Sequence, residues 1–478
     1  MTSAPHPMDA YFPVPRGWRR AASVVIPLGA IGVAIYAARH DLMPTTDAAV
    51  MLAILLWVAG YWATEVIPAV ATSLLAIGLV IIGLGIAPAL LRTPAPEALE
   101  WSHFLTPAAS PVMLLMLGSL MLSEGCRRTG VDAIIGVKLL RPFATSPRRL
   151  VLGVLLVAAW LSMWTSNTAT AAILLSVTRP LWTSDELDAS FRGAIVLAIA
   201  VGANIGGIAT PVGSPPNAIV FGTLNAAGYG VNFLRWMLLG LPVAGALLGV
   251  AWVVLARGGA WTHQTGPVTL TFAPTAAPRW SRAAMMAVFC ITVLLWITSP
   301  WTRLPVSVAA LVPAVLLPAL GILRPQDLAR LDWDVLLLIA GGLVLGEGLA
   351  ASGLAAAVAQ AIPLDVLPGI LLVAALALLS LVLSSFMSNT AVANLLCPLG
   401  LGIAVAFSGG EGQGWLMREA GLAIAFASGA AMVLPVSTPP NALTYRTGLV
   451  PLWRLIGVGL LMGLGACACV VIGAWLRA

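Results

Sequence analysis

Long apolar runs separated by short polar gaps account for most of the chain. Many runs approach the ~20 residues that a helix needs to cross the ~30 Å hydrocarbon core of a bilayer. Two apolar stretches, 150–182 and 366–403, are interrupted midway by polar residues. We expect an all-α polytopic membrane protein with about 11 transmembrane helices plus two re-entrant hairpins. The predicted spanning helices are 22–39, 46–64, 66–88, 105–125, 192–225, 233–256, 283–300, 304–323, 333–351, 418–446 and 451–475.

The composition agrees with this class and excludes several others. Hydrophobic residues make up 60% and charged residues 9% of the 478 residues, against roughly 45–50% and 25% in soluble domains. The net charge of +6 comes from residues in the short gaps, which is typical of membrane loops and not of a nucleic-acid surface. The five cysteines form no C-x-x-C pair and the four histidines lie outside the apolar runs. We therefore expect no catalytic metal centre and no cofactor.

Basic residues are distributed unevenly between the two sides of the predicted membrane. If both interrupted stretches enter and leave on the same side, 18 of the 24 Lys and Arg residues fall on one side and 6 on the other. The side rich in basic residues is the cytoplasmic one. This bias predicts a cytoplasmic N-terminal segment at 1–20, a retained first transmembrane helix within 21–45, a cytoplasmic linker at 258–282 and an external C-terminus. We expect a location in the cytoplasmic (inner) membrane of the cell.

Three segments recur in the same order at nearly one spacing. Residues 120–130, 162–169 and 211–218 match 343–353, 384–391 and 435–442, at offsets of 223, 222 and 224. An odd number of predicted crossings separates equivalent segments, which indicates an inverted-topology repeat. The first repeat is expected over 46–257, with a hairpin at 150–182 and a broken helix at 192–225. The second is expected over 283–478, with a hairpin at 366–403 and a broken helix at 418–446.

The sequence Ser-Asn-Thr stands in the middle of each interrupted stretch, at 166–168 and 388–390. Polar residues at that depth are unfavourable unless they line a cavity or are buried in protein. Ser, Asn and Thr are favoured N-cap residues, and helix-forming residues follow, so each motif is expected to open the second helix of a hairpin. Hydrogen bonding between helices explains one such motif, whereas two at matched positions favour a binding site.

A second paired motif, Ser-Pro-Pro-Asn at 214–217 and Thr-Pro-Pro-Asn at 438–441, lies inside two other spans. Two consecutive prolines break the hydrogen bonding of a helix. Ser or Thr before Pro fits an N-cap followed by Pro at the first helical position. Each span is therefore expected to be two half-helices with an unwound joint, which in paired repeats is typical of a transporter site.

The electrostatics of these four helix starts favour a divalent anion. Each helix N-terminus carries roughly +0.5 of an elementary charge, so four supply about +2. Neither motif contains Arg or Lys, and a mobile cation is expected to complete the charge balance. Ser162 and Ser384 stand one turn before Ser166 and Ser388, where each adds an oxygen to a candidate cation site.

On these paired motifs the chain resembles the divalent anion:sodium symporter (DASS) family, the INDY-like dicarboxylate transporters. The resemblance covers nearly the whole chain from the second span onward. It implies sodium-coupled symport of C4-dicarboxylates such as succinate, malate and fumarate, by an elevator movement of a transport domain in a homodimer. The implied sodium sites are Ser162, Ser166, Asn167 and Gly213 in the first half, and Ser384, Ser388, Asn389 and Ser437 in the second. The implied anion contacts are Asn167, Thr168, Ser214, Pro215, Asn389, Thr390, Thr438 and Pro439.

Several alternatives stay open at this level. Within transport they are a sodium-independent dicarboxylate or citrate exchanger and a sulfate transporter. Ser214 stands where the family often has Thr, and Gly213 differs from its counterpart Ser437. An intramembrane enzyme is not expected, because the chain lacks G-x-S-x-G and H-E-x-x-H. Glu124 and Glu347 occupy matched positions and are interpreted as helix anchors near the interface rather than proton carriers.

Overall fold

The computed structural model describes residues 16–91, 100–257, 277–360, 368–407 and 414–477, and every regular element in these ranges is a helix. Within these described ranges, eleven helices are long and apolar enough to cross a membrane. Nine coincide with predicted spans, and two, Gly369–Phe386 and Asn389–Ala406, are arms of the second predicted hairpin. The expected all-α polytopic membrane class is confirmed. Residues 1–15 of the predicted N-terminal segment and 258–276 of the predicted linker lie outside the described ranges.

The helices of the first half run from the N-terminal span to the end of the first repeat. In order they are α1 (Arg16–Arg39), α2 (Thr46–Thr64), α3 (Ala69–Val80), η2 (Ile81–Ile86), α4 (Ala87–Leu91), η3 (Trp101–Ala109), α5 (Pro111–Thr129), α6 (Val131–Leu140), η4 (Arg141–Phe143), α7 (Pro147–Ser162), α8 (Asn167–Val177), α9 (Arg179–Trp182), α10 (Ala189–Ile208), α11 (Pro215–Ala226) and α12 (Phe233–Arg257). The helices α7 and α8 form the first hairpin, and α10 and α11 form the first broken helix.

The second half presents a matching series. It comprises α13 (Arg279–Thr302), α14 (Val306–Ala309), α15 (Leu311–Ala319), α16 (Pro325–Leu328), α17 (Trp333–Ala351), α18 (Leu354–Gln360), α19 (Gly369–Phe386), α20 (Asn389–Phe407), α21 (Gly414–Gly429), α22 (Pro439–Tyr445) and α23 (Leu452–Arg477). The helices α19 and α20 form the second hairpin, and α21 and α22 form the second broken helix.

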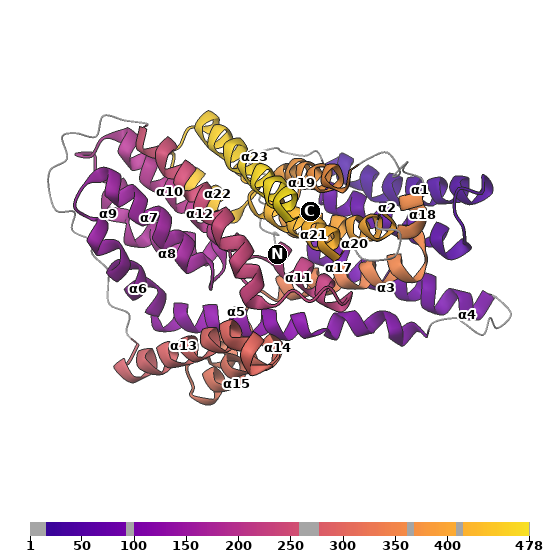
Figure 1. Cartoon of the computed structure of the whole chain (residues 1–478), viewed down its shortest axis with the longest axis horizontal. Coiled ribbons are helices and arrows are strands. Elements are labelled where there is room, and N and C mark those ends of the chain that lie inside the picture. The colour runs from indigo at the N-terminus through magenta and orange to yellow at the C-terminus, as the bar shows by residue number, and fades with distance from the viewer. Residues whose placement is uncertain (1–15, 92–99, 258–276, 361–367, 408–413, 478) are drawn as a thin grey trace.

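The two halves are interlocked through their broken helices. The helix α11 of the first half packs against α20 and α21 of the second, and α22 of the second packs against α8 and α10 of the first. In Figure 1 the helices α6 to α9 lie at one end of the long axis, α1 to α4 lie near the other end, and α13 to α15 lie along one edge beside α5. The broken helices therefore bring residues from both halves together.

Two glycines mark the joints between a long helix and a short one. Gly130 ends α5 with a φ of 70°, and Gly353 separates α17 from α18 with a φ of 75°. Residues with a side chain rarely adopt this left-handed conformation. The two glycines are 223 positions apart, so the repeat extends to these turns.

Three predicted spans differ in detail from the structure. The span at 66–88 holds a π-helical segment, η2, beside the close contact of Gly85 with Trp101, where an added Cβ would lie 2.7 Å from the Trp101 Cα. The span predicted at 105–125 starts earlier in the structure, because η3 precedes α5 and Pro111 begins a new helix. The span at 304–323 is divided into α14 and the nine-residue α15.

Candidate functional site

The tip of the first hairpin is an extended turn closed by hydroxyl groups. Ser166 is the N-cap of α8, and its Oγ accepts a hydrogen bond from the Ala169 N–H at 3.2 Å. The hydroxyls of Thr165 and Thr170 bond each other at 2.9 Å. The helix α8 therefore begins at the first Ser-Asn-Thr motif, with Ser166 as its N-cap.

Oxygen atoms from three elements converge at the side chain of Asn167. Ser162 Oγ lies 2.6 Å from the Asn167 amide, the Gly213 carbonyl lies 3.1 Å away and the Ala203 carbonyl 3.3 Å away. When the amide presents its nitrogen, it donates to these oxygens. When it presents its oxygen, the Ser162 hydroxyl donates to it at 2.6 Å and the two carbonyl oxygens face it with no donor between them, an arrangement suited to a cation.

The backbone beside this cluster has no room for side chains. A Cβ on Gly207 would lie 2.7 Å from Asn167 Oδ1 and 3.1 Å from the Gly213 carbonyl oxygen. The structure thus brings together three of the predicted residues, Ser162, Asn167 and Gly213. Sequence reasoning missed Ala203, because it contributes only its backbone carbonyl.

The tip of the second hairpin contains buried polar atoms at the equivalent positions. The helix α19 ends at Phe386 and α20 begins at Asn389, directly after Ser388. Among the described residues, Ser384 Oγ and Asn389 Oδ1 have no hydrogen-bond partner, although both atoms are buried. They correspond to Ser162 and Asn167, whose side chains meet in the first half.

Each hairpin tip is tied to the unwound joint of its own half. Thr210 donates to the Met163 carbonyl at 2.6 Å, and Ser437 donates to the Ser385 carbonyl at 3.1 Å. Met163 and Ser385 are equivalent residues of the repeat, but Thr210 and Ser437 are not. The hydroxyl of Ser437 therefore has a structural bond in addition to its predicted place in a cation site, and Thr210 is a site residue that the sequence did not single out.

The asparagine of each Pro-Pro-Asn motif stabilises the unwound segment by hydrogen bonds to its backbone carbonyls. Asn217 Nδ2 donates to the carbonyls of Gly207 at 2.7 Å, Thr210 at 2.7 Å and Ile208 at 3.3 Å. Asn441 Nδ2 makes the same kind of contacts with Met432 at 2.7 Å and Leu434 at 3.1 Å. These carbonyls lost their helical partners where the chain unwinds, and a buried carbonyl needs a donor.

The residue before the two prolines behaves differently in the two halves. Thr438 is an N-cap that accepts from the Asn441 N–H at 3.3 Å, as predicted. Ser214 is the N-cap residue of α11, with Pro215 at the start of the helix as predicted, but its side chain makes no capping hydrogen bond. Ser214 has the extended backbone of an N-cap, but its buried Oγ has no partner among the described residues. The helix that follows Thr438 is also short, at seven residues.

The predicted anion contacts range from exposed to buried. Thr168 and Pro439 are exposed and Pro215 is half-buried, whereas Ser214, Thr390 and Thr438 are buried. The two exposed residues lie on α8 and α22, which pack together. Thr168 and Pro439 are thus the predicted anion contacts that reach the protein surface.

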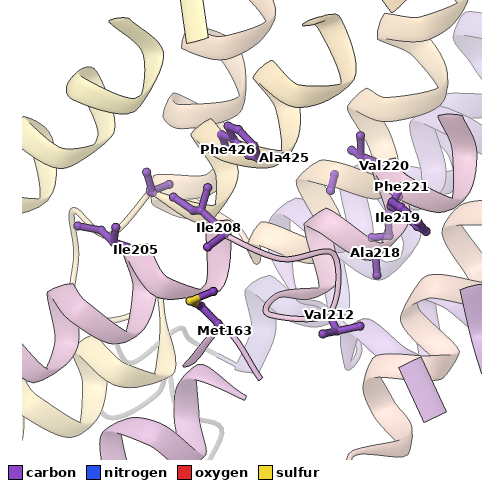
Figure 2. Packing of buried hydrophobic residues seen from close by; sticks show 14 of the residues in the cluster. Met163, Ile205, Ile208, Val212, Ala218, Ile219, Val220, Phe221, Ala425 and Phe426 are labelled. Carbon is purple, nitrogen blue, oxygen red and sulfur yellow. The ribbon is translucent and has the colours of Figure 1, made fainter. Parts of the chain in front are cut away.

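Apolar side chains surround the first break. Figure 2 shows Ile208 at the end of α10, Met163 from the hairpin tip, and Ala425 and Phe426 from α21. All four are at most 9% exposed and belong to one buried cluster. A polar group placed in such surroundings interacts more strongly with its partners than it would in water.

Glu124 and Glu347, the glutamates at matched positions, lie away from these motifs, and each has a side-chain partner. Glu124 accepts from Arg127 Nε at 2.7 Å, and Glu347 lies 2.8 Å from His103 Nε2. Burial raises the pKa of Asp132 in α6 to about 6, although the Ala133 N–H and Arg127 oppose that shift. A cavity of about 1090 Å³ adjoins His103 and Glu347 but includes none of the predicted site residues.

Two hairpins and two broken helices around buried polar groups define a secondary membrane transporter and not an enzyme. The chain belongs to the CitMHS citrate transporter family, whose model matches residues 59–418. It is 28% identical over 446 residues to the sodium-dependent dicarboxylate transporter SdcS of Staphylococcus saprophyticus, with 86% of this chain and 82% of the relative covered. It is 29% identical over 445 residues to SdcS of Staphylococcus aureus strain USA300, with the same coverage. The family resemblance predicted from the motifs is confirmed.

Two solved structures share the fold at low sequence identity. The YdaH transporter of Alcanivorax borkumensis matches with a TM-score of 0.52 and 11% identity, covering 85% of this chain and 97% of that one. MtrF of Neisseria gonorrhoeae, which belongs to a class of antimetabolite efflux pumps, matches with a TM-score of 0.52 and 12% identity, covering 87% and 96%. At this identity the likeness concerns the fold alone.

Proposed function

We propose that this protein is a sodium-coupled symporter of C4-dicarboxylates such as succinate, malate or fumarate. The observation that carries the proposal is the cluster of oxygens around Asn167. Oxygen atoms at an unwound helix are typical ligands of a coupling cation in transporters. A cation between them selects the amide orientation that presents oxygen, and the other orientation satisfies the amide when the cation has left. The relatives named sodium-dependent dicarboxylate transporters support sodium as this cation.

The proposed sodium sites follow the two hairpin tips. The first comprises Ser162, Ser166, Asn167 and Gly213, to which we add the Ala203 carbonyl because it lies 3.3 Å from the Asn167 amide. The second comprises Ser384, Ser388, Asn389 and Ser437. The buried, unpartnered oxygens of Ser384 and Asn389 support it, since buried polar atoms normally have partners.

The proposed anion site lies between the two tips and the two breaks. Hydroxyl and amide groups of Asn167, Thr168, Ser214, Asn389, Thr390 and Thr438 supply hydrogen bonds, and Pro215 and Pro439 line the helix starts. The first residues of α8, α11 and α20 add the positive ends of helix dipoles. No Lys or Arg lies within these motifs. Bound sodium therefore supplies the rest of the positive charge and makes anion binding dependent on sodium.

Thermal stability provides the test. At a concentration about 100 times Kd, a ligand that binds only the folded state stabilises it by about 2.7 kcal/mol. We expect succinate to raise the melting temperature of the purified protein in sodium chloride and to leave it unchanged in potassium or choline chloride. Equal stabilisation in all three salts favours a sodium-independent exchanger. Citrate and sulfate belong in the same panel, because the family model is that of citrate transporters.

The proposed mechanism is an elevator movement in a homodimer within the cytoplasmic membrane. The two repeats, 46–257 and 283–478, have opposite orientations in this proposal, so one half forms the inner gate and the other the outer gate. The N-terminus is cytoplasmic and the C-terminus external. The matched order of helices α5 to α12 and α17 to α23 supports the repeat, and the excess of basic residues in alternate loops supports the orientation.

Cysteine labelling tests this topology. Thr145, before α7, and Ala406, in the last turn of α20, are both exposed. In a background without the five native cysteines, a membrane-impermeant maleimide should label Ala406→Cys in intact cells. It should label Thr145→Cys only after permeabilisation. Labelling of both variants from the same side contradicts the inverted repeat.

A further inference from the structure

One side chain of the first half reaches into the second break. Asn204 of α10 is 1% exposed, and its Nδ2 donates to Thr438 Oγ1 at 3.1 Å and to Asn441 Oδ1 at 3.1 Å. The two acceptors are more than 230 positions away in sequence. Both hydrogens of the Asn204 amide are therefore used within the second half.

The donor and acceptor in each of these hydrogen bonds can be assigned by starting from the backbone carbonyls that Asn441 contacts. Asn441 Nδ2 must face the carbonyls of Met432 and Leu434, since a carbonyl only accepts. Asn441 therefore presents its side-chain oxygen to Asn204, and the Asn204 amide must donate to it through its nitrogen. Thr438 then has to accept the second hydrogen of that nitrogen.

The consequence falls on the hydroxyl of Thr438. A hydroxyl has two acceptor positions and one hydrogen. Thr438 Oγ1 accepts from Asn204 Nδ2 at 3.1 Å and from the Asn441 N–H at 3.3 Å. Both acceptor positions are filled, so the hydrogen of Thr438 is directed away from these partners and is left to donate.

The equivalent position of the first half has no such arrangement. The offset of 224 that relates Ser214 to Thr438 places Ser428 opposite Asn204. Ser428 Oγ, Ser214 Oγ and Asn217 Oδ1 are buried and have no hydrogen-bond partner among the described residues. Serine lacks the amide that lets asparagine span the two halves. The Ser214 hydroxyl is therefore not oriented by a donor.

We propose that Asn204 is a positioning residue for the transported anion, which fixes the Thr438 hydroxyl as a hydrogen-bond donor to one carboxylate. The inference rests on the proposed function, in which Thr438 contacts the anion. It assigns different roles to the two breaks, since Thr438 is an oriented donor and Ser214 is not. An oriented donor favours a charged acceptor, so this end of the site selects a carboxylate over a neutral amide.

A double-mutant cycle tests the inference, with succinate binding measured at saturating sodium. Thr438→Val should weaken binding about 10- to 150-fold, the loss expected for a hydrogen bond to a charged group. Asn204→Ser, which installs the residue found at 428, should weaken it about 3- to 10-fold. The double variant should bind as Thr438→Val does, because Asn204 acts through Thr438. Thr438→Ser is the matched control, in which Asn204→Ser should still weaken binding.

Selectivity separates positioning from a structural role. Asn204→Ser should lower the preference for succinate over its monoamide, a ratio that simple destabilisation does not change. If the double variant loses affinity by the product of the two single losses, the two residues act independently. That result overturns the inference and leaves the proposed function unaffected. Normal binding by Thr438→Val overturns the assignment of Thr438 itself. If Asn204→Ser does not fold, Ser428→Asn carries the test, since folded protein should bind succinate several-fold more tightly, and unchanged binding overturns the inference.

Discussion

Replacing Asn217 by aspartate should abolish recovery of folded, monodisperse protein at neutral pH. Asn217 is fully buried, and its Nδ2 donates to three carbonyls at the first break. Aspartate puts a carboxylate oxygen where the donor stood and faces it with carbonyl oxygens. Each buried group left without its partner costs about 1–3 kcal/mol, and an uncompensated buried charge costs about 3–5 kcal/mol. The sum is comparable to the total stability of many proteins.

The pH dependence of this variant identifies the cause. A protonated carboxyl recovers one donor, whereas the carboxylate has none. The variant should therefore be more stable in acid than at neutral pH. Size-exclusion profiles and melting temperatures across pH measure this. The matched control is Asn232→Asp, because Asn232 is exposed and its side-chain oxygen accepts from the Arg235 N–H at 2.7 Å, which aspartate does equally well. Wild-type stability of Asn217→Asp contradicts the structural role of the motif.

At the second hairpin tip, Thr390→Ala should lower the affinity for the anion about 10- to 150-fold, which is the loss expected for one hydrogen bond to a charged partner. Thr390 is 8% exposed and follows Asn389 in the first turn of α20. In the proposed site its hydroxyl faces the anion, so the apparent sodium affinity at saturating anion should change little. Ser388→Ala should mainly lower the affinity for sodium. The affinity for the anion should then recover at high sodium, because the two binding events are linked.

Binding titrations of succinate at several sodium concentrations distinguish the two variants. Ser380→Ala is the control, because Ser380 is buried in α19 before the tip and its Oγ has no partner among the described residues. It should leave both affinities unchanged. The division of roles is refuted if Thr390→Ala and Ser388→Ala behave alike, or if sodium rescues only Thr390→Ala.

The hairpin and break positions were readable from the sequence because local chemistry determines them. Proline has no N–H to continue a helix, and Ser166 accepts from the backbone three residues ahead, so both signals act within one turn. The nearly constant offset between the repeats also indicated that Ser162, Asn167 and Gly213 have counterparts in the second half. Local signals did not decide Ser214, which has the sequence of a cap but makes no capping bond.

The tertiary structure alone decided which groups from distant parts of the chain meet. Ala203 enters the candidate cation site through a carbonyl, a group that every residue possesses and that leaves no mark in a sequence. Thr210 and Ser437 tie equivalent hairpin tips from positions that the repeat does not relate. Asn204 crosses between the halves to Thr438, and its mirror position holds a serine that is too short to do so. The sequence determined the elements of the site because their signals are short-range, and packing determined its hydrogen bonds because these join residues that only the fold brings within 3 Å or so of one another.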